Sequence, residues 1–186
     1  MALKVNEIFY SIQGESLYTG LPCVFVRLTG CNLRCAYCDT RYAYEEGELY
    51  TTDQIMDQIA AFGCKRVAIT GGEPLLQEDA PRLATRLLDT GHDVLVETNG
   101  SLNIDRMDAR CSRIVDIKCP SSSMDHHNDP ANISRLTPHD QVKFVIGSRD
   151  DYDFSKRARP ALPDFFSGDR VLFSAVSGKL PPSELA

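Results

Sequence analysis

The sequence of 186 residues contains no tryptophan and no apolar run long enough to cross a bilayer. Its first residues, MALKVNEIFYSIQGES, lack the apolar core of a signal peptide, so we expect a cytoplasmic chain with no membrane partner. Acidic residues outnumber basic ones by 26 to 20, and the net charge of −6 argues against a nucleic-acid partner. Internal repeats, low-complexity tracts and linkers rich in proline or glycine are also missing. The length and the 42% apolar content therefore predict one domain over residues 1–186.

Six short runs rich in β-branched and apolar residues predict strands. They cover residues 23–29, 65–70, 93–98, 112–118, 141–146 and 170–175. Helical patterns at residues 51–63 and 79–91 separate the first three of these runs. Thr51 and Gln54 suit a capping box before one helix, and Gly63 and Gly91 suit the ends of two helices. Strands that alternate with helices predict a mainly parallel sheet, whereas the polar segment 119–140 is expected to be mostly loop.

One face of the predicted strands carries polar side chains. Apolar residues recur with period two, as in Val24, Val26 and Leu28, and would pack under the helices. The opposite positions hold Arg27, Thr70, Glu97, Asp116, Lys118 and Lys143. Because unpaired buried charges are costly, we expect a curved sheet whose concave face binds a polar ligand. The fold would be an incomplete α/β barrel of about six mainly parallel strands. The simpler alternative is a face exposed to solvent.

Arg27 makes this expectation most specific. Its neighbours Val26 and Leu28 point toward the helices, so Arg27 must point toward the concave face. No acidic residue lies within its own strand at 23–29. We therefore expect a ligand to neutralise it, and a carboxylate matches the guanidinium geometry best.

Three of the seven cysteines lie within eight positions, in the stretch TGCNLRCAYCDT. These are Cys31, Cys35 and Cys38, directly after the first of the six predicted strands. Tetrahedral metal sites and ordinary iron–sulfur clusters use four protein ligands, so three cysteines leave one position open, as in catalytic zinc sites. Structural zinc completed by a distant Cys or His is the alternative. The scattered cysteines are expected to be small, partly buried thiols: Cys23, Cys64, Cys111 and Cys119.

Two glycine-containing loops follow the next two strands. They are TGGEP at residues 70–74 and ETNG at residues 97–100. Taken alone, each is explained by a simple turn. Because they lie at the same end of successive parallel strands as the three thiols, together they predict one site.

The spacing C-x3-C-x2-C, with Tyr37 before the last cysteine, resembles the radical S-adenosylmethionine (SAM) superfamily. The stretches EIFYSIQGES and GLPCVFVRLTGCNLRCAYCDT, with the two glycine-containing loops, resemble the 7-carboxy-7-deazaguanine synthase family. This resemblance runs from about residue 4 to residue 175. It implies one radical SAM domain, built as an incomplete βα barrel, with a [4Fe–4S] cluster whose open iron binds SAM.

The resemblance also implies an activity. Members of the family are lyases that convert 6-carboxy-5,6,7,8-tetrahydropterin to 7-carboxy-7-deazaguanine. The reaction is a radical-mediated ring contraction with loss of ammonia, on the route to queuosine and other 7-deazapurines. The cofactor carries the difficult chemistry, because cleavage of SAM yields an adenosyl radical.

Residue roles follow from the same resemblance. Cys31, Cys35 and Cys38 would hold the cluster that cleaves SAM, and Thr40 would bind Mg²⁺, although capping of the next turn also explains Thr40. The implied pterin-binding residues are Ile12, Gln13, Gly14, Glu15, Arg27, Thr70 and Glu97. The implied SAM-binding residues are Tyr37, Cys38, Asp39, Gly72, Glu73, Asp116, Ile117, Lys118 and Ser174.

Partners are implied as well: a flavodoxin- or ferredoxin-type reductant and a second copy of the chain in a homodimer. The family's polar and aromatic C-terminal tail, which helps to close the substrate site, is expected to be missing after VSGKLPPSELA. Two rival functions stay open, an activase of glycyl-radical enzymes and a non-catalytic iron–sulfur protein. His126 and His127 offer a further metal site, but a solvated loop is the simpler interpretation.

Overall fold

The computed structural model describes residues 2–185, so residues 1 and 186 of the predicted domain lie outside it. Eight strands form one sheet in the order β3-β1-β2-β4-β5-β6-β7-β8. They are β1 (Ala2–Ile12), β2 (Pro22–Leu28), β3 (Glu48–Thr51), β4 (Arg66–Gly71), β5 (Asp93–Thr98), β6 (Ser112–Asp116), β7 (Gln141–Ile146) and β8 (Val171–Ala175). The six predicted strands are β2 and β4 to β8, and each pairs in parallel with its neighbours in that series. The mainly parallel, incomplete barrel is therefore confirmed.

Two further strands lie at one edge of the sheet and fall outside the six predicted ones. β1 pairs antiparallel with both β2 and β3. Only Leu3 and Val5 of β1 are fully buried, and β3 has four residues, so neither strand carries a strong apolar alternation. The expected number of about six strands is thus too low by this antiparallel pair.

In the described part of the chain, four α-helices accompany the sheet: α1 (Thr52–Ala61), α2 (Ala80–Asp89), α3 (Asn132–Arg135) and α4 (Arg149–Ala158). The predicted capping box begins α1, because Thr51 Oγ1 accepts from the Gln54 N–H while the Gln54 side chain accepts from the Thr51 N–H. Gly63 and Gly91 follow α1 and α2 with φ of 62° and 87°, as helix-ending glycines do. Within residues 2–185, no helix is long and apolar enough to cross a membrane.

The sequence pattern does not predict α4, because most of its residues are polar. Its start is nevertheless well defined, because Ser148 Oγ accepts from the Asp151 N–H and two acids occupy the first turn. The segment 119–140 holds α3 and short 3₁₀ turns between irregular stretches, as predicted.

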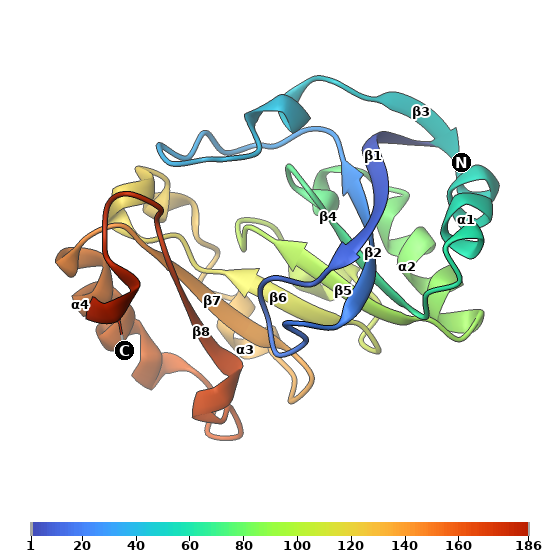
Figure 1. Cartoon of the computed structure of the whole chain (residues 1–186). Coiled ribbons are helices and arrows are strands. Elements are labelled where there is room, and N and C mark those ends of the chain that lie inside the picture. Colours follow the sequence, from blue (N-terminus) through green and yellow to red (C-terminus); the bar gives the residue numbers. More distant parts are fainter. Residues whose placement is uncertain (1, 186) are drawn as a thin grey trace.

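The helices lie around the outer side of the curved sheet (Figure 1). Val24, Val26 and Leu28 pack there with helix residues such as Ile59 and Leu83 in the main core, which confirms the period-two prediction. Burial of each such aliphatic side chain contributes about 1.5–3 kcal/mol to the stability of the fold. A smaller apolar cluster on the concave side fills the N-terminal half of the strands: Cys23, Phe25, Ala68, Leu95 and Ile114.

Two loops cover the concave face from its opposite ends. The cysteine loop (residues 29–47) lies over the C-terminal strand ends, where Asn99 donates to Asn32 Oδ1 at 3.0 Å and the Ala36 N–H donates to the Ser122 carbonyl. The strap loop (residues 13–21), between β1 and β2, lies over the other end. Its Leu17 N–H donates to the side chain of Gln141 at the start of β7. Figure 1 shows both loops in shades of blue, one above and one below the strands.

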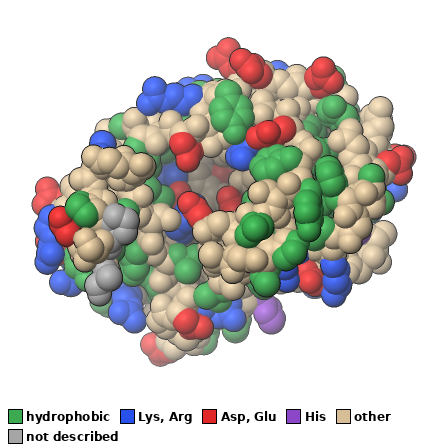
Figure 2. Space-filling model, viewed as in Figure 1, with side chains coloured by type: hydrophobic (Ala, Val, Ile, Leu, Met, Phe, Trp, Pro, Cys, Tyr) green, Lys and Arg blue, Asp and Glu red, His purple; other side chains and the backbone are tan. Residues whose placement is uncertain are grey.

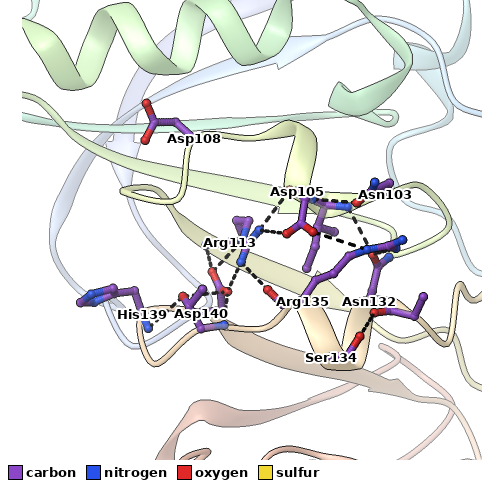
Figure 3. Close-up of polar contacts among 12 residues, drawn as sticks. Asn103, Asp105, Asp108, Arg113, Asn132, Ser134, Arg135, His139 and Asp140 are labelled. Carbon is purple, nitrogen blue, oxygen red and sulfur yellow. Dashed lines mark hydrogen bonds and ion pairs between the residues drawn. The ribbon is translucent and has the colours of Figure 1, made fainter.

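A buried ion pair outside the concave face joins β6 to the loop before β7 (Figure 3). Arg113 is 2% exposed, and its Nε and Nη2 groups donate to Asp140 at 3.0 and 2.6 Å. Asp140 also accepts from the N–H and the hydroxyl of Thr137. The remaining donors of Arg113 reach the carbonyls of Ile104 and Arg135. Because every partner is supplied, the pair fixes the irregular segment against the sheet.

Removing the Asp140 charge should make the folded protein less stable. We expect Asp140→Asn to lower the free energy of unfolding by about 3 kcal/mol or more, because the Arg113 charge stays buried without its main partner. The matched control is Asp89→Asn, which breaks an exposed ion pair with Arg110 and should cost about 0–1 kcal/mol. Urea unfolding measures both, and equal losses in the two variants would contradict this role.

Candidate active site

A cavity of about 610 Å³ opens on the concave face. Its volume falls within the range of ligand sites, roughly 300–1,000 Å³. Figure 2 shows a hollow on this side of the molecule, with acidic and basic side chains in its wall. The lining includes most of the predicted site residues: Ile12, Gln13, Gly14, Glu15, Arg27, Cys31, Cys35, Tyr37, Cys38, Asp39, Thr40, Thr70, Gly72, Glu97, Asp116, Lys118 and Ser174. Glu73 and Ile117 are the two predicted residues that do not line it.

The three clustered thiols reach the cavity from the cysteine loop. Cys31 Sγ accepts from the Leu33 N–H at 3.4 Å, and Asn99 Nδ2 lies 3.8 Å from the same sulfur. In the described part of the chain, no three His, Cys, Asp or Glu side chains converge tightly enough to hold one metal ion. In an iron–sulfur cluster each thiolate binds its own iron, so such convergence is not required. Three thiols on one loop beside a cavity fit an iron–sulfur cluster.

The four scattered cysteines lie away from the cavity lining. Cys23, Cys111 and Cys119 are fully buried, and burial raises the pKa of each of these thiols to about 12. Cys64 is partly buried. The expectation of small, partly buried thiols holds for Cys64, whereas the other three are buried more completely than expected.

Two polar atoms of the cavity wall have no hydrogen-bond partner within residues 2–185. They are the Tyr37 hydroxyl and Asp116 Oδ1, and both are buried. Burial also raises the pKa of Tyr37, so the phenol stays protonated and able to donate. An unpaired buried polar atom is costly, so these two atoms mark places in the wall where a partner is missing.

Lys118 and Asp116 form an ion pair in this wall, with Nζ 2.6 Å from Oδ2. Their side chains are 11% and 13% exposed. Burial lowers the pKa of Lys118, but the charges of Asp116 and of the nearby Cys35 outweigh it, so the pKa is raised. The ammonium group is therefore charged beside the cysteine loop.

Glu73 holds the two glycine-containing loops, TGGEP and ETNG, together. Its carboxylate is fully buried and accepts from the N–H groups of Leu75 and Asn99 at 2.9 and 2.7 Å. It also accepts from the Thr98 hydroxyl at 2.9 Å. Burial raises the pKa of Glu73, and these hydrogen bonds oppose that rise. The side chain thus joins the TGGEP turn to the ETNG loop and does not face the cavity.

The glycines of the TGGEP turn permit close contact with the cysteine loop. Gly71 has a φ of 138°, and a Cβ at Gly72 would overlap the carbonyl oxygen of Gly30. The Glu73 N–H donates to that same carbonyl at 2.7 Å. Backbone atoms of Gly72 therefore lie in the cavity wall next to Cys31.

Arg27 faces the cavity, as predicted, but it has a partner from its own chain. Its Nε lies 2.7 Å from Glu7 Oε1 on β1, directly across the antiparallel pair. The expectation that only a ligand neutralises Arg27 is therefore wrong, because the acid comes from the neighbouring strand. The guanidinium also lies over the rings of Phe9 and Tyr42, at 5.7 and 5.8 Å. Its side chain remains 17% exposed.

Glu97 is held in the cavity by neutral donors. Its carboxylate accepts from the Thr70 hydroxyl at 2.9 Å and from Gln13 Nε2 at 3.4 Å. Gln13 comes from the strap loop and Thr70 from β4, so both neighbours fix the carboxylate from either side. This arrangement leaves an anionic group able to accept N–H donors from a ligand.

Thr40 lines the cavity and begins a 3₁₀ turn at Arg41–Tyr44, but its side chain does not cap that turn. The hydroxyl donates instead to Asp39 Oδ1 at 2.8 Å. Two hard oxygen donors therefore stand together at the cavity mouth. His126 and His127 are exposed, with ring centroids 4.2 Å apart, in agreement with a solvated loop.

Several lining residues are absent from the predicted site. Asn99 and Thr98 lie within the quoted ETNG loop, so a closer examination of that motif could have found them. Lys143 carries the inward parity of its strand but belongs to no quoted motif. Tyr44 gives no sequence signal, because only the folded cysteine loop brings it to the cavity.

The role assigned to Glu73 predicts a stability effect. We expect Glu73→Ala to lower the free energy of unfolding by on the order of 3 kcal/mol, because three buried donors lose their acceptor. Glu78→Ala, at an exposed position nearby, is the control and should change it by less than about 0.5 kcal/mol. Urea unfolding of the two variants decides the matter, and a Glu73→Ala protein as stable as the control would refute the role.

Known proteins resemble this chain in sequence and in fold. The family model described as "Radical SAM superfamily" matches residues 25–158. A 7-carboxy-7-deazaguanine synthase from Chlorobaculum tepidum is 44% identical over 99% of this chain and 84% of that relative. The enzyme of that name from Koribacter versatilis is 45% identical over 83% of this chain and 69% of the relative.

A solved structure agrees with this fold. The crystal structure of QueE from Escherichia coli superposes with a TM-score of 0.82, covering 100% of this chain and 88% of that one. Its sequence identity is 23%, so the likeness concerns the fold alone. The matched superfamily region and the identity to full-length relatives together place the sequence: the chain belongs to the radical SAM superfamily and, within it, to the 7-carboxy-7-deazaguanine synthase family.

Proposed function

We propose that this chain converts 6-carboxy-5,6,7,8-tetrahydropterin to 7-carboxy-7-deazaguanine, with loss of ammonia, in queuosine and 7-deazapurine biosynthesis. The observation that carries the proposal is one cavity lined both by the three clustered thiols and by paired, charged side chains. Curated relatives of this name at 44% and 45% identity support it. A concave cavity of this volume suits a small substrate better than the protein substrate of an activase.

The cysteine-loop end of the cavity would hold the cluster and SAM. Cys31, Cys35 and Cys38 supply three thiolates, and SAM would occupy the remaining iron. When bound, the group supplies a carbon-centred radical from SAM, which starts the rearrangement. Tyr37 and Asp116 line the same cavity and would contact SAM.

Further contacts to SAM are proposed on their position in the wall. Backbone atoms of Gly72 and the charged Lys118 lie in the wall of the same cavity. Asp39 and Ser174 also line the cavity. Glu73 and Ile117 would act through the backbone or through their neighbours, because neither lines the cavity.

The strap-loop end of the cavity would orient the pterin. Glu97 offers a carboxylate that neutral donors hold in place, and it suits the N–H groups of a pterin ring. Arg27 suits the substrate carboxylate, because Glu7 engages only Nε and the Nη groups carry four more N–H donors. Ile12, Gly14 and Glu15 complete this wall from the strap-loop side. Held in this way, one face of the ring is presented to the reacting carbon.

Magnesium belongs to the proposal through Thr40 and its neighbour Asp39. Their side-chain oxygens stand 2.8 Å apart in the cavity wall, and oxygen is the donor that Mg²⁺ prefers. Substrate oxygens and water would complete the coordination.

The finer expectations about partners and location are also proposals. They comprise a flavodoxin- or ferredoxin-type reductant, a homodimer and a single domain over residues 1–186. A cytoplasmic location is supported by the seven cysteines, all of which are free thiols. Sedimentation equilibrium of the purified protein tests the homodimer directly.

Turnover under anaerobic conditions tests the proposed function. The reconstituted protein should form 7-carboxy-7-deazaguanine from the carboxylated pterin when SAM, Mg²⁺ and a reductant are all present. Product is identified by mass and ultraviolet absorption, and omission of each component is the control. Cleavage of SAM without any change in the pterin would contradict the proposal.

Arg27 should matter through its geometry as well as its charge. We expect Arg27→Ala to lower kcat/KM by about ten- to a hundredfold, the cost of one charged hydrogen-bonded contact. Arg27→Lys should lose much of the activity too, since one ammonium group cannot serve both Glu7 and a bidentate carboxylate. Arg86→Ala removes a surface ion pair on α2 and serves as the control. Parent-like kinetics for Arg27→Ala would mean that other residues hold the substrate carboxylate.

Variants of the clustered and of the scattered cysteines should differ in the amount of iron that the protein binds. We expect Cys35→Ala to lose the intact cluster and SAM cleavage, because one iron loses its thiolate. Cys111→Ala, which removes a buried thiol outside the cavity, should keep the parent's iron and sulfide content. Full cluster content in Cys35→Ala would overturn the ligand assignment.

A further inference from the structure

The strap loop spans much of the sheet, yet few side chains hold it there. Residues 13–21 leave β1 and reach β7, and β2, β4, β5 and β6 lie between these two strands in the strand order. Gln13 contacts Glu97 on β5, and the Leu17 N–H donates to Gln141 Oε1 at 2.9 Å. The third anchor is the ion pair between Glu15 and Lys143, with Nζ 2.7 Å from Oε2. Tyr18 also packs against the smaller apolar cluster, and Arg66 on β4 lies over its ring at 4.9 Å. Of the three polar anchors, two stand on β7.

The two β7 anchors are two residues apart and point to the same concave face. Gln141 is fully buried, and its Nε2 lies 3.4 Å from Ser112 Oγ, so the amide that receives Leu17 is itself fixed. Lys143 is further along the strand, nearer to the proposed substrate, and lines the cavity. The contacts of Gln141 and Lys143 thus tie the strap loop to β7 at two points.

Lys143 lies among acidic groups of the cavity. Its side chain is 12% exposed, and Asp116 stands opposite it in the parallel register of β6 and β7. Burial lowers the pKa of Lys143, but the charges of Asp116, Glu15 and Glu97 outweigh it, so the pKa is raised. A charged ammonium at this point draws the carboxylate of Glu15 toward β7, although that side chain is half exposed to solvent.

We propose that Lys143 is a positioning residue for substrate recognition: its ion pair with Glu15 holds the strap loop across the concave face and so places Gln13, Gly14 and Glu15 for the pterin. The inference rests on the proposed function for the identity of the substrate. The placement of the loop itself does not depend on that identity.

The loop can be tested in the substrate-free holoenzyme by amide hydrogen exchange. Lys143→Met keeps an unbranched side chain one atom shorter and removes its charge, and Glu15→Gln breaks the same pair from the exposed side. Both variants should speed exchange of the Glu15 and Leu17 amides about two- to fivefold, the opening expected from the loss of one partly exposed ion pair. Lys143→Arg should restore protection. Lys65→Met, which breaks an exposed ion pair with Asp93, is the matched control and should exchange like the parent.

Kinetics supply the second measurement. Lys143→Met should raise KM for the pterin about threefold or more while kcat falls less, because binding must then order the loop. Parent-like exchange of the strap loop in both Lys143→Met and Glu15→Gln would overturn the proposal. An equal rise in exchange throughout β4 to β7 would also overturn it, since Lys143 would then serve general stability. If the parent protein fails to act on the pterin, the proposed function falls, and the exchange data still decide the role of Lys143.

Discussion

The alternation of side chains along parallel strands is the constraint on which the rest of this structure depends. Helices cover one face of the sheet, so every second residue of β2, β4, β5, β6 and β7 must face the other side. Toward the C-terminal strand ends those residues are polar or charged. Each charge there needs a partner, and the pairing of these charges shapes the cavity.

The protein satisfies most of these groups by itself and leaves a few unsatisfied. Glu7, Asp116 and Glu15 neutralise Arg27, Lys118 and Lys143 in turn. In contrast, the Tyr37 hydroxyl and Asp116 Oδ1 remain without partners in the described chain, and Glu97 meets only neutral donors. Most charged groups of the wall are thus held by contacts within the protein, so a polar ligand would meet side chains that are already oriented.

The sequence predicts well those features that depend on local order along the chain. The capping box of Thr51 and Gln54 and the inward positions of Thr70 and Glu97 follow from spacing alone. What the sequence does not reveal depends on neighbours across the sheet. The pairing of Arg27 with Glu7 requires the antiparallel strand β1, whose apolar alternation is weak. The orientation of Glu73 toward Asn99, away from the cavity, likewise requires the folded arrangement of two loops.

The central claim is that three cysteines hold a cluster with one open iron, beside a cavity for the substrate. The most direct measurement is the electron paramagnetic resonance spectrum of the reduced, anaerobically reconstituted protein before and after addition of SAM. A [4Fe–4S] signal that shifts when SAM is added is the predicted result. A cluster signal that stays unchanged at saturating SAM would contradict the claim, because every iron would then already have its ligands.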